Sequence, residues 1–206
     1  MEKPVDNLLD VLCTSSARAR VLELFFVDPS RRHYLRQVQH ETDQPVRAVQ
    51  RELARLSMAG LLIRYKDGNR VYYALDRNHP SFGPLRALVI SGLSVPARMQ
   101  AELAEVPGVR MAFVRETPEG WTVLVVGDMV TKHRVVSALE RVGVAVDTSI
   151  YESDEFLRML NDKTSEVRRQ VERSVEIMSR TEDLLWHRVK EIGIESQLEL
   201  DGRSAR

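Results

Sequence analysis

Hydrophobic residues in the first sixty positions recur at helical spacing. The segment Ser15–Phe26 places its apolar side chains on one helical face, with one of the two serines at its start as the expected N-cap. Tyr34–Glu41 has the pattern of a short amphipathic helix, and the turn Thr42–Pro45 leads into a stronger helix at Val46–Ala59. Gly60 is expected to end that helix. Its expected buried stripe consists of Val46, Val49, Leu53 and Leu56.

The residues that follow form two short runs rich in the residue types that favour β-strands. Leu61–Tyr65 and Arg70–Leu75 are expected to form a hairpin around a Lys-Asp-Gly-Asn turn, because Asp-Gly supplies the positive φ angles of tight turns. Tyr72 and Tyr73 then point to opposite faces, so that one of them packs on the core. Three helices, the last two joined by a short turn, followed by a hairpin predict a winged helix-turn-helix domain over residues 1–80.

Beyond residue 80 the pattern indicates a helical connector and then a small α/β domain. The connector, 81–105, has helical patterns near 82–91 and 96–105. The domain, 106–162, is expected to contain strands at Val109–Arg115, Trp121–Val126 and Val144–Tyr151 and helices at Thr131–Val142 and Ser153–Leu160. The predicted fold class is therefore α+β.

A long helix is expected over 163–194. Val171, Met178, Leu185 and Ile192 recur every seven residues, although the d-type positions between them, Ser174, Thr181 and Arg188, are polar. A helix of about 30 residues spans about 45 Å, which exceeds the needs of a small domain. We therefore expect these four residues to contact a second subunit in a homodimer, and a helix that lies along its own chain is the alternative. The tail, 195–206, is expected to be flexible.

Charge is unevenly distributed along the chain. Of the 206 residues, 30 are Lys or Arg and 30 are Asp or Glu, so the formal net charge is zero. Residues 1–95 nevertheless contain 14 basic and 10 acidic side chains, a net of +4, and residues 31–70 contain 9 basic and 4 acidic side chains, a net of +5. A local basic surface is typical of proteins that bind a polyanion. An arginine-rich helix face that is merely solvated is the alternative interpretation.

Several other classes of protein do not fit the sequence. No apolar stretch approaches the roughly 20 residues of a transmembrane helix, and no signal peptide is expected from the N-terminal residues. The single cysteine, Cys13, excludes an internal disulfide framework, and the five histidines show no close metal-ligand spacing. We therefore expect a cytoplasmic protein without a metal, a cofactor or a membrane partner.

The helix at Val46–Ala59 is the expected reader of DNA. The second helix of a helix-turn-helix enters the major groove, where arginine can bond guanine and glutamine can bond adenine. The candidate base-reading residues, which point away from the apolar stripe, are Gln44, Arg47, Ala48, Gln50 and Arg51. The candidates for contacts with phosphates, in the hairpin and around the helices, are Arg31, Arg32, His33, Arg55, Arg64, Lys66, Asn69 and Arg70. Arg51 lies far enough along its helix to meet a phosphate as well.

The run YLRQVQHETDQPVRAVQRELARLSMAGLLIRYKDGNRVYYAL carries a family resemblance. Residues of about 8–80 resemble the winged helix-turn-helix domains of bacterial and archaeal ArsR/MarR-like transcription regulators. The resemblance implies binding of double-stranded DNA. Metal-sensing members of that group use cysteine-containing motifs on a helix, and this chain has only Cys13, so metal sensing is not expected.

A second resemblance covers residues of about 100–160. The stretch PGVRMAFVRETPEGWTVLVVGD, followed by a helix and VGVAVDTSIYESDEF, resembles the minimal nucleotidyltransferase domain often fused behind such a winged helix. Active members carry Gly-Ser after the first strand and Asp-x-Asp at the start of the second, which hold the triphosphate and two Mg²⁺ ions. Here Arg115-Glu116 replaces Gly-Ser, and Gly120 and Thr122 occupy the aspartate positions. The carboxylates that remain nearby are Asp128 and Asp147.

These patterns predict a homodimeric, sequence-specific DNA-binding transcription regulator that is not an enzyme. The second domain would act as a scaffold, with a pocket for a small effector as the alternative. Two other functions stay open. One is an active nucleotidyltransferase whose winged helix recruits an acceptor, and the other is an antitoxin-like module whose α/β domain covers a partner enzyme.

Overall fold

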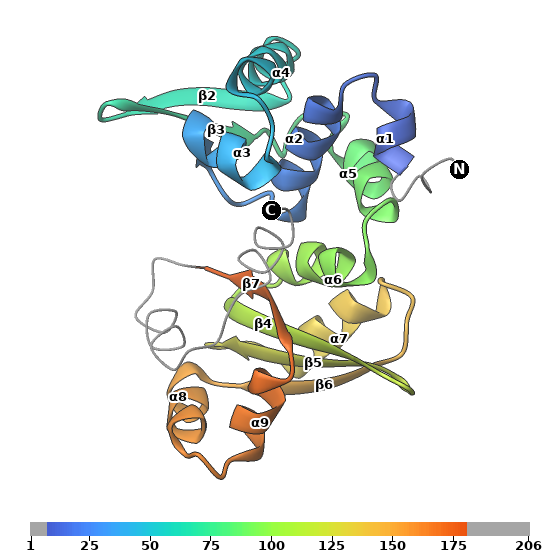
Figure 1. Cartoon of the computed structure of the whole chain (residues 1–206), viewed down its shortest axis with the longest axis vertical. Helices are drawn as coiled ribbons and strands as arrows, with labels where there is room; N and C mark the ends of the chain where they lie inside the picture. The colour runs from blue at the N-terminus through green and yellow to red at the C-terminus, as the bar shows by residue number, and fades with distance from the viewer. Residues whose placement is uncertain (1–7, 181–206) are drawn as a thin grey trace. The chain divides into compact units, whose positions relative to one another are not determined.

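The computed structural model describes residues 8–180 and shows a mixed α+β fold (Figure 1). The chain divides into two compact units between Ala101 and Glu102, within helix α6 (Val95–Ala104). Each unit has its own sheet and its own hydrophobic core. Among the described residues, no helix combines the length and the apolar character needed to cross a membrane.

The N-terminal unit begins with four helices whose ends follow local sequence signals. They are α1 (Leu8–Leu12), α2 (Ser16–Val27), α3 (Leu35–Thr42) and α4 (Val46–Met58). Ser15 caps α2, since its hydroxyl accepts a hydrogen bond of 3.3 Å from the Arg18 N–H. After α4, Gly60 has a φ of 78°, and the Leu61 N–H donates to the Leu56 carbonyl at 3.0 Å. This is a Schellman ending, and it confirms that Gly60 terminates the helix.

A three-stranded antiparallel sheet follows, in the order β1-β3-β2. Its strands are β1 (His33–Tyr34), β2 (Leu62–Asp67) and β3 (Arg70–Leu75). Asp67 pairs with Arg70, so that the hairpin loop consists of two residues, and Gly68 has the positive φ, 58°, that such a turn requires. The predicted hairpin is therefore confirmed, whereas the two-residue β1 is too short to have been recognised from its sequence.

The core of this unit is built mainly from α2, with contributions from α3, α4 and the sheet. Phe25 and Phe26 are its largest side chains, and Tyr73 packs against it, as expected for one of the two adjacent tyrosines. Helix α5 (Phe82–Ser91) packs on the same core through Val89, so that the first unit extends past residue 80. Val46, expected to be buried, is 39% exposed because it is the first residue of α4 and lies before the buried stripe begins.

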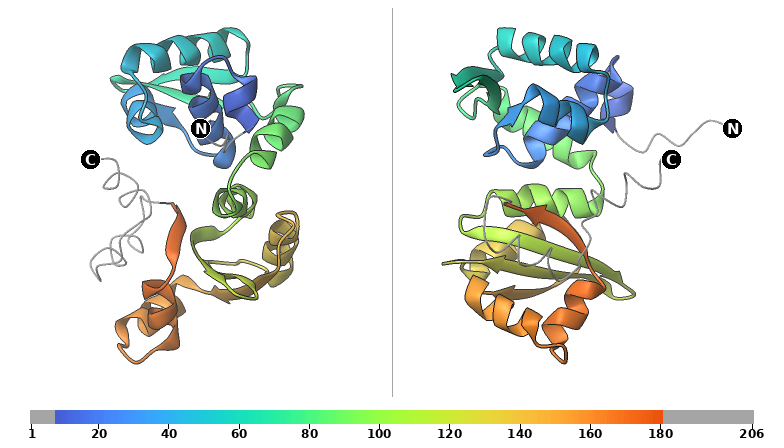
Figure 2. Two further views of the ribbon diagram at one scale, coloured as in Figure 1. Left: turned by 45° about the vertical axis from the view of Figure 1, so that its right-hand side comes forward. Right: turned by 60° about the vertical axis from the view of Figure 1, so that its left-hand side comes forward.

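The second unit is a four-stranded sheet in the order β6-β5-β4-β7. Its strands are β4 (Val109–Thr117), β5 (Gly120–Gly127), β6 (Val146–Tyr151) and β7 (Val175–Ser179). Strands β5 and β6 are parallel and joined through α7 (Lys132–Glu140), whereas β4 is antiparallel to both of its neighbours. Helix α7 lies on one face of the sheet, and α8 (Ser153–Asn161) and α9 (Glu166–Glu172) lie on the other (Figure 2).

The predicted long C-terminal helix is wrong within the described residues. Helix α9 ends at Glu172, where the Ser174 hydroxyl donates to the Gln170 carbonyl at 2.7 Å, and the chain then forms β7 against β4. Val171 and Met178, expected at a dimer contact, are instead buried in the core of their own unit. A short apolar run fits a buried strand and a helix equally well. Here the run forms a strand because it pairs with the edge of β4 that β5 does not occupy. Outside the described residues lie Leu185, Ile192 and the tail 195–206.

Candidate nucleic-acid interface

The outer face of α4 presents the base-reading candidates to solvent. Arg47, Gln50 and Arg51 are exposed, and Ala48 is half-buried beside them. Within residues 8–180, neither Arg47 nor Gln50 forms a side-chain hydrogen bond or an ion pair. The amphipathic pattern of the helix therefore placed these polar groups correctly, and two of them are available to an external partner.

Gln44 has a different environment from the other candidates. Its Oε1 accepts a hydrogen bond of 3.1 Å from the Ser16 hydroxyl at the start of α2. Its Nε2 lies 3.4 Å from the Asp43 carbonyl, and Asp43 itself has the left-handed φ of 49° that ends α3. Gln44 thus helps to join the α3–α4 turn to α2.

A buried carboxylate on α4 was not anticipated from the sequence. Glu52 has no exposed surface, and its carboxylate accepts a hydrogen bond of 2.9 Å from Arg18 Nε on α2. Arg55 Nη1 lies 3.2 Å from the same carboxylate, and Arg51 Nε lies 3.6 Å from it. Burial alone would raise the pKa of Glu52, but the Arg18 hydrogen bond and the three positive charges together lower it. Arg51 and Arg55 therefore remain exposed while sharing one carboxylate.

The hairpin supplies a second group of exposed polar side chains, three of which are cationic. Arg64, Lys66, Asn69 and Arg70 are all exposed, as predicted. Within the described part of the chain, neither Arg64 nor Lys66 has an ion-pair partner. The guanidinium of Arg70 lies 4.9 Å from the centre of the Tyr34 ring, which holds its side chain without neutralising it.

The residues that precede α3 are more constrained than expected. Arg31 forms an ion pair of 3.1 Å with Glu41, and Arg32 one of 3.4 Å with Asp67 while its guanidinium lies over the Tyr72 ring. Both arginines are exposed and can be reached by a phosphate. Because each is already paired with a carboxylate, the phosphate would have to displace that carboxylate.

The prediction that His33 contacts a phosphate is wrong. Its side chain has no exposed surface and meets the Phe25 ring edge-on at 5.1 Å between centroids. Its Nδ1 lies 3.8 Å from a Glu41 oxygen, beyond hydrogen-bond distance. Burial, together with the charge of Arg31, lowers the pKa of His33 to about 3, so that the imidazole is neutral at physiological pH. Pairing of β1 with Tyr73 turns this residue inward, and the two-residue strand gave no periodic signal of it.

In the second unit, the positions compared with nucleotidyltransferase residues lie at the amino end of β5. Arg115 and Glu116 are strand residues, paired with Thr122 and Trp121 across a tight hairpin. Gly120 has a φ of 138°, and a Cβ atom there would lie 2.6 Å from the Ala145 carbonyl oxygen, so an aspartate does not fit. Asp147 is exposed beside Thr122 in the parallel pair.

Asp128, the other carboxylate singled out in the sequence, lies beyond the opposite end of β5 and has a structural role. It accepts hydrogen bonds from the Ser153 backbone N–H at the start of α8 and from the Arg110 guanidinium. Hydrogen bonds with Ser153 and Arg110 lower the pKa of Asp128 despite partial burial. No group of three or more potential metal ligands occurs among the residues that the structure describes.

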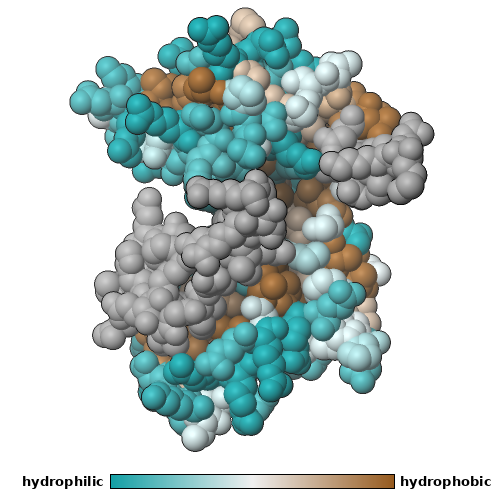
Figure 3. Space-filling view, in the orientation of Figure 1, coloured by the Kyte–Doolittle hydropathy of each residue, from teal (hydrophilic) through white to brown (hydrophobic). Residues whose placement is uncertain are grey.

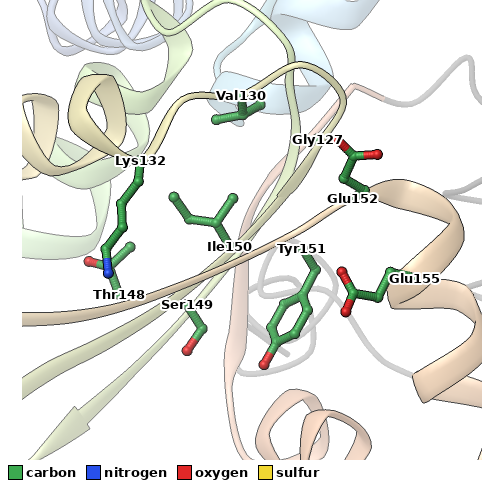
Figure 4. A pocket seen from close by; sticks show the side chains of 9 residues that line it. All are labelled: Gly127, Val130, Lys132, Thr148, Ser149, Ile150, Tyr151, Glu152 and Glu155. Carbon is green, nitrogen blue, oxygen red and sulfur yellow. The ribbon is translucent and has the colours of Figure 1, made fainter.

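An open hollow of about 490 Å³ lies at the carboxyl ends of β5 and β6 (Figure 4). Ile150 lies on one side of β6, and Ser149 and Tyr151 lie on the other, so the hollow follows the edge of this strand. Lys132, Glu152 and Glu155 give its lining charges of both signs. It lies at the other end of β5 from Gly120 and Thr122, and is therefore distinct from the positions compared with catalytic aspartates.

The exposed cationic side chains of the N-terminal unit thus concentrate on α4 and the hairpin, where the sequence predicted them. The buried Glu52 and His33 were missed, because their environments depend on residues distant in the sequence. Comparisons of the chain with protein-family models, with curated proteins and with solved structures found no match.

Proposed function

We propose that the N-terminal unit is an ArsR/MarR-like winged helix-turn-helix that binds double-stranded DNA with sequence specificity. Helices α3 and α4 would form the helix-turn-helix, and the β2–β3 hairpin would be the wing. The observation that carries the proposal is the outer face of α4, where Arg47 and Gln50 are exposed and, within residues 8–180, have no partner of their own. A helix in the major groove needs such groups to read base edges.

The other cations have supporting roles in this proposal. Arg64 and Lys66 on the hairpin would contact phosphates or the minor groove, and Arg55 would contact a phosphate beyond the base-reading residues. Arg51 would contact either a base edge or a phosphate. Arg31 and Arg32 would contribute only after leaving Glu41 and Asp67, whereas the buried His33 has no role at the interface.

We further propose that the protein acts as a homodimer, with a dimer contact on the N-terminal unit. Val171 and Met178 are buried within one chain and cannot supply this contact. Val11 and Leu12 on α1 are 63% and 56% exposed, and Leu88 on the adjacent α5 is 36% exposed. Figure 3 shows hydrophobic surface beside α1. Exposed apolar side chains gathered on two neighbouring helices are typical of a protein-protein contact.

The second unit is proposed to be an inactive, nucleotidyltransferase-like scaffold. The main support is Gly120, whose backbone conformation and contact with Ala145 leave no room for a metal-binding carboxylate. The single exposed Asp147 beside Thr122 cannot clamp two metal ions by itself. We therefore propose a cytoplasmic transcription regulator rather than an enzyme.

Capture of bound genomic DNA fragments on the purified full-length protein, followed by footprinting, tests this function. We expect enrichment of a pseudo-palindromic site, with half-sites about one or two helical turns apart. Binding should fall steeply with salt, because it depends on a modest number of phosphate contacts. The proposal is wrong if no duplex is retained at low ionic strength.

A further inference from the structure

A second open hollow, of about 460 Å³, lies in the N-terminal unit beside the hairpin. It lies where β1 gives way to α3, next to β2 and β3. Its lining combines an apolar group with three arginines. The apolar group consists of Leu35, Val71 and the Tyr73 ring, and the arginines are Arg36, Arg64 and Arg70.

Among the residues that the structure describes, none that lines this hollow is acidic. Within residues 8–180, neither Arg36 nor Arg64 forms an ion pair or a side-chain hydrogen bond, and the Arg70 guanidinium lies over the uncharged ring of Tyr34. The acidic residues on the same elements are occupied elsewhere, because Glu41 pairs with Arg31 and Asp67 pairs with Arg32. Three arginines therefore line one hollow, and within residues 8–180 none of the three has an ion-pair partner.

Such an arrangement favours an anion with several acceptor oxygens. A carboxylate carries one negative charge, whereas a phosphate monoester carries about −1.5 to −2 at neutral pH and three strong acceptor oxygens. Arginine binds phosphate oxygens in pairs through its planar fork of N–H donors. The number of cations thus matches a phosphate monoester better than a carboxylate.

The apolar part of the hollow indicates that the anion is attached to a larger group. A volume of about 460 Å³ exceeds the needs of a phosphate alone and lies in the range of small-ligand sites, about 300–1,000 Å³. Leu35, Val71 and the Tyr73 ring offer apolar surface to a flat group next to the arginines. A phosphodiester of a DNA backbone would use the cations but would leave this surface uncovered.

We propose that this hollow binds a free phosphate monoester attached to a flat group, such as a nucleoside monophosphate. Arg36 and Arg64 hold the phosphate, Arg70 adds a third positive charge from beside Tyr34, and the flat group lies against the apolar lining. The site is separate from the outer face of α4, but it shares Arg64 with the proposed wing contacts to DNA.

Calorimetric titration of the full-length protein with adenosine 5′-monophosphate, without DNA, tests the site. Adenosine and inorganic phosphate serve as partial ligands. We expect the monophosphate to bind more tightly than either of them, and Arg36→Gln or Arg64→Gln to weaken it about tenfold or more. Arg134→Gln, at an exposed arginine on α7 of the second unit, should leave binding unchanged. Matching thermal melts would show that the variants are folded.

Duplex-binding measurements on Arg36→Gln distinguish a free ligand from the DNA backbone, because Arg36 lines the hollow and is not among the residues that we propose to contact DNA. Loss of monophosphate binding with duplex affinity retained supports the proposal. Equal weakening on all duplexes, together with displacement of the monophosphate by DNA, would overturn it and assign the cations to the backbone. Absence of monophosphate binding at millimolar concentration, or equal binding by both variants and wild type, would also overturn it. Failure of the DNA-binding function would appear separately, as no duplex retention by the wild type.

Discussion

Arg18 on α2 and Glu52 on α4 are joined by a hydrogen bond of 2.9 Å, and the Glu52 side chain has no exposed surface. The bond connects two helices, and the two bonded residues are 34 positions apart in the sequence. It fixes the inner side of α4, while Arg47 and Gln50 occupy the outer side. A polar contact within the unit therefore helps to hold the helix that we propose to read DNA.

Replacing Glu52 by Gln should lower the free energy of unfolding of the N-terminal unit by about 1–3 kcal/mol, because a buried charge-assisted bond is lost. Arg18→Gln should have a similar effect. In a double-mutant cycle followed by urea unfolding, the two losses should not add, because both remove one interaction. Additive losses would show that Arg18 and Glu52 do not stabilise the unit together.

The buried His33 predicts a specific loss of stability in acid. Its pKa is about 3 in the folded protein, against an ordinary value of 6.5, so the unfolded chain takes up a proton first as pH falls. The contribution of the neutral His33 to the free energy of unfolding is fully present above about pH 6.5. It is lost as the pH falls toward 3, at up to about 1.4 kcal/mol per pH unit.

His33→Phe should remove this dependence, since phenylalanine does not titrate, and His40→Gln, at an exposed histidine, should retain it. The measurement is the free energy of unfolding between pH 7 and pH 5. The raised pKa of Glu41, caused mainly by its burial, acts in the opposite sense from about pH 4.5 upward, so the pH slope of each variant is compared with that of the wild type. An unchanged pH slope in His33→Phe would contradict the neutral, buried histidine.

Arg47→Ala should weaken binding to the specific duplex about ten- to a hundredfold more than binding to random DNA, because it removes a base contact. Lys66→Ala should weaken both duplexes alike and reduce the salt dependence by about one phosphate contact. Fluorescence anisotropy at several salt concentrations measures both effects. Equal losses on the two duplexes for Arg47→Ala would remove its base-reading role.

Leu12→Lys should convert the proposed dimer into a monomer, because it places a charge in the exposed apolar surface of α1. Met129→Lys is the matched control, since Met129 is 91% exposed in the second unit. Light scattering coupled to size-exclusion chromatography reports the mass of each protein. A dimer that persists in Leu12→Lys would place the contact elsewhere.

Gly120→Asp should destabilise the second unit, because its φ of 138° and the nearby Ala145 carbonyl exclude a side chain. Thr122→Asp, at a half-buried strand position two residues along, should be tolerated. Thermal unfolding compares the two variants, and labelled nucleoside triphosphates with Mg²⁺ test them for transfer. Incorporation of label by the wild type would contradict the proposal of an inactive domain.

Short-range chemistry made much of this fold predictable. The φ of Gly60, the hairpin at Gly68 and the bounds of Phe82–Ser91 follow from residues within a few positions of each other. The exposed face of α4 was also predictable, because helical periodicity separates Arg47 and Gln50 from Val49 and Leu53. These features depend on backbone geometry and on the separation of polar from apolar side chains.

Tertiary structure decided what depends on distant partners. Residues 175–179 form a strand because β4 offers them an unpaired edge, and Val171 is buried because the α8–α9 face of the sheet needs apolar cover. His33 is buried because β3 pairs with it, and Glu52 is charged in the interior because Arg18 reaches it from α2. The sequence alone determined which side chains share the polar face and which share the apolar face of a single helix or strand. Contacts between elements determined burial and ion pairing, because desolvation and charge pairing depend on the groups that folding brings together.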